Sequence, residues 1–119
     1  MAIADITSAE RWMVQTTCNE RRDQVELHPV DVELKLDPHS EELTSSPALF
    51  WQVEECSFVI VKTRGGRFRG NFFYQDLQQY GTGIPEYDDI SECAVALLRV
   101  QADHRSVRSG AYRDRQPDG

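Results

Sequence analysis

The sequence predicts an α+β fold in which an antiparallel sheet of about four strands carries an N-terminal and a C-terminal helix, in the order α-β-β-β-β-α. Three observations predict it. Two runs of β-branched and aromatic residues flank a Gly-Gly pair at 65–66, apolar and charged residues alternate over 30–36, and helix-start signals lie near both ends of the chain. We expect one domain over residues 1–105 and a polar tail over 106–119.

The first helix is expected over residues 6–22. Thr7 and Glu10 have the spacing of a capping box, and Ile6 precedes them as a hydrophobic staple would. The residues that follow at helical spacing predict one face of this helix, made of Ala9, Trp12, Met13 and Thr16. Because Trp12 also alternates with β-prone residues, a strand remains the alternative.

The first strand is expected within residues 25–36, where Val30, Val32, Leu34 and Leu36 alternate with Asp31, Glu33 and Lys35. This period of two predicts one buried face and one wet face. Pro29 lacks an N–H for the ladder, so it should begin the strand or lie on an edge. A turn at 37–40 and a polar loop at 41–47 should lead to a second strand over 49–54, which ends at a bulge or tight corner formed by Glu54 and Glu55.

Residues 56–62 and 68–74 form the predicted central hairpin. A two-residue Gly-Gly turn is favoured because glycine adopts positive φ without steric cost, and it places Val59 opposite Phe72. In that register Val59 and Val61 face the core together with Phe72, and four cations gather at the tip: Lys62, Arg64, Arg67 and Arg69. These cations are either a solvated hairpin end or a contact surface for an anionic partner or phosphate.

The last part of the chain is expected to be a long loop over residues 76–88 and a helix from Asp89 to about His104. Asp89 and Glu92 fit an N-terminal cap, and the helix carries a stripe of Ile90, Cys93, Ala94, Leu97 and Gln101, widened by Leu98 and Val100. Loops of this length are often functional. One hypothesis is therefore a pocket between sheet and helix, lined by Asp76, Tyr80, Tyr87 and Asp88.

The composition limits the classes of function. The 119 residues are 39% hydrophobic, which supports one modest core, and no apolar run approaches the ~18 residues of a membrane span. No signal peptide is visible, so we expect a cytoplasmic location, or export by a route that leaves no such mark. Three widely spaced cysteines, Cys18, Cys56 and Cys93, favour buried free thiols over a disulfide framework or a zinc site. The three histidines are dispersed and no catalytic or phosphate-binding motif is present, so no catalytic residue, metal or cofactor is predicted.

Charge is unevenly distributed along the chain. Residues 23–55 hold nine acids against Lys35 alone, a net charge of −8, so the remainder carries +1 of the total of −7. An acidic balance opposes general nucleic-acid binding and favours steered docking on a basic partner protein. The predicted partner-binding residues are Asp31, Glu33, Glu41, Glu42, Glu54 and Glu55.

The second half also has a family likeness. A hairpin, the run Tyr74-Gln75-Asp76-Leu77, a glycine-bearing loop and an acid-capped helix together resemble the small HicB-like antitoxin domain over about residues 58–104. Gln75 stands where that family usually has proline, the loop is longer, and the N-terminal half has no counterpart. The resemblance implies an inhibitory protein.

We therefore expect a bacterial, non-catalytic protein-binding module, most concretely a small acidic inhibitor of immunity or antitoxin type. Two alternatives remain open. One is a small enzyme or ligand-binding domain that uses the pocket near residues 76–88, and the other is a regulatory subunit of a larger assembly. The sequence does not predict the oligomeric state.

Overall fold

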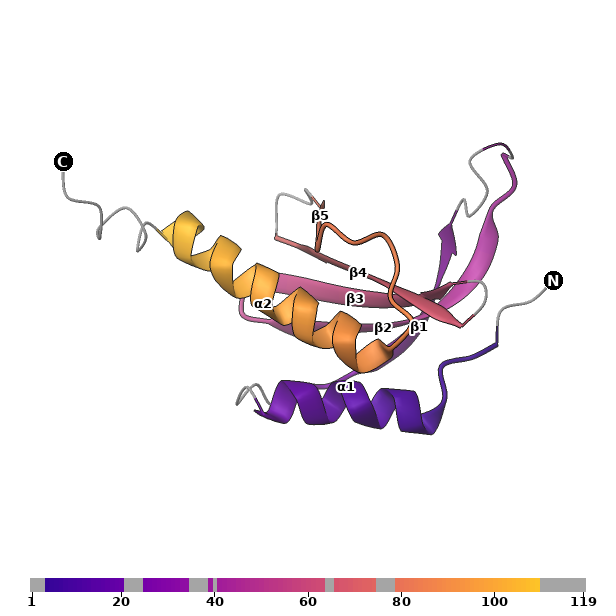
Figure 1. Ribbon diagram of the computed structural model, residues 1–119, viewed down its shortest axis with the longest axis horizontal. Helices are drawn as coiled ribbons and strands as arrows, with labels where there is room; N and C mark the ends of the chain where they lie inside the picture. The colour runs from indigo at the N-terminus through magenta and orange to yellow at the C-terminus, as the bar shows by residue number, and fades with distance from the viewer. Residues whose placement is uncertain are drawn as a thin grey trace.

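The computed structural model describes residues 4–20, 25–34, 39, 41–63, 66–74 and 79–109. Its elements are α1 (Ser8–Glu20), β1 (His28–Leu34), β2 (Thr44–Val53), β3 (Cys56–Thr63), β4 (Arg67–Phe73), β5 (Gln79–Gly81) and α2 (Ile90–Ser109). The strands form one antiparallel sheet in chain order, with α2 across one face and α1 packed beside α2 (Figure 1). The predicted α+β order is confirmed, and β5 adds a short fifth strand inside the expected loop. Neither described helix is long and apolar enough to cross a membrane.

Both helix starts were readable from the sequence. The Thr7 amide donates to Glu10 Oε1 at 2.8 Å and the Glu10 amide donates to Thr7 Oγ1 at 3.1 Å, which is the reciprocal pairing of a capping box. The Ser91 amide donates to Asp89 Oδ1 at 2.7 Å. The predicted stripe of α2 is buried at Ile90, Cys93, Ala94, Leu97 and Leu98. The helix extends to Ser109, so residues 106–109, expected in the tail, are helical.

The buried face of α1 differs from the predicted one. Val14, Thr17 and Cys18 pack into the core, whereas Trp12 is 66% exposed and Met13 is also exposed. Thr17 can be buried because its hydroxyl donates to the Met13 carbonyl at 2.8 Å. The predicted buried face of α1, which followed the large apolar residues, was therefore wrong. The helix instead buries a neighbouring face that carries smaller side chains.

Strand β2 begins earlier than expected, at Thr44, so part of the predicted polar loop is strand. Pro47 lies within β2 opposite Asp31, while pairing of β2 with β3 begins only at Ala48. Because Pro47 has no N–H to donate, the hydrogen-bonded pairing between β2 and β3 stops at its neighbour Ala48. The start of β2 consequently pairs with β1 alone, and this two-stranded ribbon projects from the body of the molecule (Figure 1). Pro29 lies in β1, an edge strand, as expected.

The β2–β3 connection is a tight turn of Glu54 and Glu55 between the paired residues Val53 and Cys56. Glu54 has φ of 55°, a left-handed conformation that is uncommon for residues other than glycine, asparagine and aspartate. The corner predicted at this pair is therefore a two-residue hairpin turn that holds one glutamate in a strained conformation.

The β3–β4 hairpin has a different register from the predicted one. Thr63 pairs with Arg67 and Phe58 pairs with Phe72, so three residues rather than two form the loop. Gly66 has φ of 73°, which matches three-residue hairpin loops that end in a left-handed residue. Arg64 and Gly65 lie outside the described residues. The register prediction was wrong by one residue.

A shift of one residue exchanges the faces of a strand. On β3 the side chains beneath the helices are therefore Phe58 and Ile60, not Val59 and Val61. Phe72 and Leu97 lie in the core and Val61 is buried, as expected, whereas Val59 and Val32 are only half-buried. Opposite Ile60, a Cβ on Gly70 would lie 3.0 Å from Cys93 Sγ, so glycine there permits the close approach of α2.

Candidate docking surface

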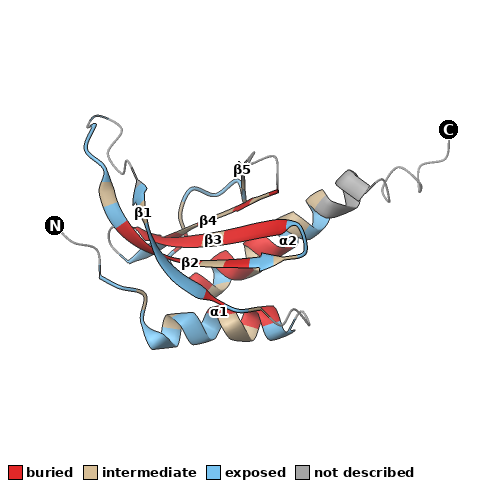
Figure 2. Ribbon diagram, turned by 180° about the vertical axis from the view of Figure 1, so that it is seen from behind, coloured by how far each residue is buried: buried red, intermediate tan, exposed pale blue. Residues whose placement is uncertain are grey.

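The face of the sheet opposite α2 carries an apolar patch, and neither of the two described helices lies over it. Figure 2 views the described residues from this side, with α2 behind the sheet. Strand pairing and alternation place seven apolar side chains on this face, which we call the outer apolar face: Val30, Val32, Ala48, Phe50, Val59, Val61 and Phe73. Ala48 and Val61 are buried, so the exposed apolar surface comes from the other five. Polar side chains share this face by the same alternation, among them Gln52, Ser57, Asn71, Arg67 and Arg69, so the outer apolar face is a patch within a mixed surface.

The centre of the outer apolar face is an aromatic pair. The rings of Phe50 and Phe73 lie 6.4 Å apart between centroids, and Val59 pairs directly with Phe50. All three side chains are half-buried. At the β1 edge Val30 is 40% exposed, which contradicts the expectation that it faces the core. The reason is that its side of the edge strand has no helix to cover it.

The six predicted partner-binding acids do not form one cluster. Asp31 and Glu33 are exposed on the edge strand β1, and their side chains alternate toward the helix side of the sheet. Glu41 and Glu42 precede β2, whereas Glu54 and Glu55 follow it. Ten residues of strand at ~3.3 Å each separate the two glutamate pairs by roughly 30 Å. The acids thus lie along one edge of the sheet and at both ends of β2.

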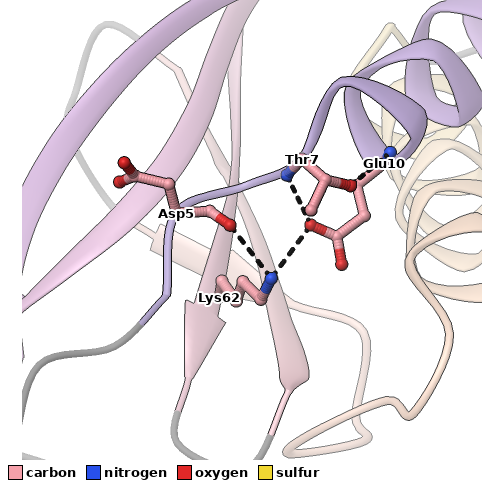
Figure 3. Close-up of polar contacts among 4 residues, drawn as sticks. All are labelled: Asp5, Thr7, Glu10 and Lys62. Atoms are coloured by element: carbon pink, nitrogen blue, oxygen red, sulfur yellow. Dashed lines mark hydrogen bonds and ion pairs between the residues drawn. The ribbon is translucent and has the colours of Figure 1, made fainter.

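The predicted cationic tip is divided. Lys62 is 8% exposed on the helix side, where its Nζ donates to Glu10 Oε1 at 3.0 Å and to the Asp5 carbonyl at 3.1 Å (Figure 3). Arg67 lies 3.3 Å from Asp88, and Arg67 and Arg69 both reach Glu86 at 3.8 and 4.0 Å. Arg64 lies outside the described residues. The three described cations therefore each have an acidic partner within the chain.

The residues of the hypothetical loop pocket do not converge. Tyr87 is buried, its backbone exchanges two 2.8 Å hydrogen bonds with Phe68, and its hydroxyl donates to Thr82 Oγ1 at 2.7 Å. Tyr80 instead packs against α2, and Asp88 is exposed beside Arg67. Asp76 lies outside the described residues. Each described member of the set has a separate structural role.

An aromatic cluster, missed at the level of the sequence, fixes β5 against α2. The His104 ring lies 4.3 Å from the Tyr80 ring and stacks on Tyr74 at 5.5 Å. His104 Nδ1 is 3.4 Å from the Tyr74 hydroxyl, to which Gln101 Nε2 also donates at 3.3 Å. In the sequence, only the spacing of Gln101 and His104 indicated that these two side chains share one face of the helix.

A groove of about 360 Å³ opens on the helix side, between the start of α1 and the paired strands β1 and β2. One wall is the segment that leads into α1, and the other is formed by β1 and β2; the lining residues are Asp5, Ile6, Thr7, Ser8, Arg11, Pro29, Val30, Asp31, Pro47, Ala48 and Leu49. Sequence reasoning missed this groove because its walls come from separate parts of the chain.

The cysteines are not arranged for chemistry. Cys18, Cys56 and Cys93 are all buried, and none forms a disulfide. Burial raises the pKa of the Cys93 thiol from 9.0 to about 12, which keeps it protonated and unreactive near neutral pH. Across the described ranges, no three histidine, cysteine or acidic side chains come together in a way that could hold a metal ion.

No protein-family model, curated protein or solved structure matches this chain. The resemblance to HicB-like antitoxin domains accordingly rests on the residues quoted above alone.

Proposed function

We propose that this chain is a non-catalytic protein-binding module that docks on a basic partner protein through the outer apolar face. The observation that carries the proposal is the half-buried aromatic pair of Phe50 and Phe73, which lies on a sheet face without helix cover. Aromatic side chains, phenylalanine included, are enriched at the centres of protein interfaces.

The charges around this face support a basic partner. Glutamates lie at both ends of β2, and the acids of the β1 edge turn toward the helix side, while the described arginines near the β4 end are already paired with acids. Protein interfaces commonly combine an apolar centre with a polar rim, and a rim of one sign steers a partner of the opposite sign. A small acidic inhibitor of immunity or antitoxin type fits this pattern.

The first test is capture of a partner from the native host with the tagged protein. We expect a stoichiometric, basic protein that is retained by wild type and lost by the double variant Phe50→Thr/Phe73→Thr. Threonine keeps the strand propensity but removes the aromatic surface. Trp12→Thr is the matched control, because Trp12 is a large exposed apolar residue on α1. Urea denaturation should show that all three proteins are folded.

The second test measures association rates with the captured partner. Reversing two rim charges, in Glu41→Lys/Glu42→Lys, should slow association and weaken its salt dependence, because rim charges act mainly on encounter. Arg67→Glu is the control of opposite sign. The proposal fails if capture survives loss of both phenylalanines but is abolished by Trp12→Thr, or if Arg67→Glu alone slows association.

A further inference from the structure

We propose that the groove between the segment leading into α1 and the β1–β2 ribbon receives an arginine side chain of the partner protein. This inference rests on the proposed function. The groove lies on the helix side of β1, and because β1 is an edge strand, a partner on the outer apolar face reaches the groove around that edge. The groove, of about 360 Å³, falls at the lower end of the roughly 300–1,000 Å³ typical of ligand pockets. It is therefore suited to one large side chain rather than to an extended ligand.

Two carboxylates give the groove its charge preference. Asp5 and Asp31 lie on opposite walls and are both exposed, and among the described residues neither carboxylate forms a hydrogen bond or an ion pair. Figure 3 shows the Asp5 carboxylate pointing away from Lys62, which contacts only the backbone carbonyl of Asp5. Both acids thus remain available to a cation that enters between them.

The third charged group in the lining is Arg11. Its guanidinium donates to the Leu27 carbonyl at 3.1 Å, which holds it against the segment that leads into β1. Two carboxylates and one guanidinium leave the lining with a formal charge of −1. The groove therefore favours a cationic ligand, although less strongly than two isolated carboxylates would.

The remaining lining suits the aliphatic part of an arginine. Ile6, Pro47 and Leu49 present apolar surface beside the two acids. Arginine joins a three-carbon stem to a planar guanidinium with five donors, so it can lie along an apolar wall and reach acceptors on both sides. An anionic ligand would be repelled, and a purely apolar one would leave the carboxylates without a partner.

The walls are held in place before any ligand binds. Lys62 Nζ donates to the Asp5 carbonyl and pairs with Glu10, which itself caps α1 through Thr7. On the other wall Pro29 and Pro47 each have a fixed φ. A preformed site loses little conformational entropy on binding, which favours recognition of a single side chain.

The test uses N-acetyl-L-arginine amide as the probe and N-acetyl-L-citrulline amide as its neutral isostere. Titrations followed by amide NMR shifts should place the arginine probe at residues 5–11, 29–31 and 47–49, with little response to citrulline. Asp31→Asn should weaken binding about fivefold, as expected for one exposed charge pair. Glu33→Gln is the matched control, because Glu33 is an exposed acid on the same face of β1 but outside the groove.

Arg11→Gln should tighten binding, because it removes the opposing charge. Equal responses to the two probes, or equal losses from Asp31→Asn and Glu33→Gln, would refute the inference. These outcomes are separate from those of the proposed function. Partner capture that depends on Phe50 and Phe73, with no binding of the arginine probe, would leave the function standing and remove the subsite. Probe binding without any such capture would remove the function instead.

Discussion

Lys62 Nζ lies 3.0 Å from Glu10 Oε1 and joins the end of β3 to the first turn of α1. The same carboxylate oxygen accepts the Thr7 amide at 2.8 Å, so one atom serves both the helix cap and the ion pair. The Lys62 and Glu10 side chains are 9% and 21% exposed, and water therefore screens this pair only weakly. Lys62 thus ties the first turn of α1 to the sheet at a largely buried point (Figure 3).

Replacing this lysine should destabilise the fold. Lys62→Met keeps the aliphatic stem but leaves the Glu10 carboxylate without its cation, and we expect a loss of about 2 kcal/mol in the free energy of unfolding. Loss of one partner of a fully buried pair costs roughly 3–5 kcal/mol, and Glu10 keeps some water and its bond from Thr7. Urea denaturation measures the change, and combining Lys62→Met with Glu10→Gln should cost less than the sum of the single variants.

The control for this prediction is Arg67→Met, since Arg67 is 58% exposed in its ion pairs. Exposed pairs contribute less than about 1 kcal/mol. Equal effects of Lys62→Met and Arg67→Met would contradict the buried role of Lys62.

The second prediction tests the observed register. Phe72 has no exposed surface and lies among aromatic rings, so Phe72→Ala should cost about 3–5 kcal/mol. Val59 lies half-buried on the outer apolar face, and Val59→Ala should cost clearly less than Phe72→Ala. Ile60→Ala, beneath the helices, should cost about 2–5 kcal/mol. If Val59→Ala proved more costly than Ile60→Ala, the register with Phe58 opposite Phe72 would be wrong.

The third prediction concerns the close contact between β4 and α2. Gly70→Ala should be destabilising, because the new Cβ would lie 3.0 Å from Cys93 Sγ and 3.4 Å from Leu97 Cδ2. Cys93→Ala removes the nearer atom, so the double variant should recover part of the loss caused by Gly70→Ala. Thermal denaturation of the four proteins gives the coupling energy. If the stability losses of the two single variants simply added in the double variant, the Cys93 thiol would not be what limits the space at Gly70.

The fourth prediction follows from the pKa of Cys93, which burial raises to about 12. Between pH 9 and 12 the unfolded chain has released this proton while the folded chain still holds it. The free energy of unfolding should therefore fall as pH rises through this window, by at most about 1.4 kcal/mol per pH unit, and the thiol should contribute no slope below it. Urea midpoints from pH 8 to 11 should fall more steeply for wild type than for Cys93→Ala. Parallel curves would rule out the thiol as a cause.

Local features were the ones that could be predicted from the sequence. The Thr7–Glu10 box and the Asp89 cap involve residues two or three positions apart, so spacing alone identifies them. The hairpin was predictable in place but not in register. Gly65 and Gly66 allow a two-residue or a three-residue loop, and β3 is apolar on both faces, so alternation could not decide between them.

Features that depend on distant parts of the chain could not be predicted. Lys62 was grouped with the cations of the hairpin tip because its partner Glu10 lies 52 positions away in the sequence. The acids of the proposed rim were visible as charges, but the aromatic pair of Phe50 and Phe73 appears only once the strands are aligned. No pattern in the sequence indicated a role for Asp5. Its neighbours in the groove include residues of β1, which begins only at His28.

The two edges of the sheet bear on how copies of this chain could accumulate into larger aggregates. On β1, Pro29 offers no N–H to an added strand, and Asp31 and Glu33 place exposed charge where a like strand would have to align. At the other edge β5 is only three residues long, which offers little ladder to extend. Open-ended growth by strand addition is thus hindered at both edges. Any assembly that this protein forms is more readily a closed complex made through the faces of the sheet than a fibre.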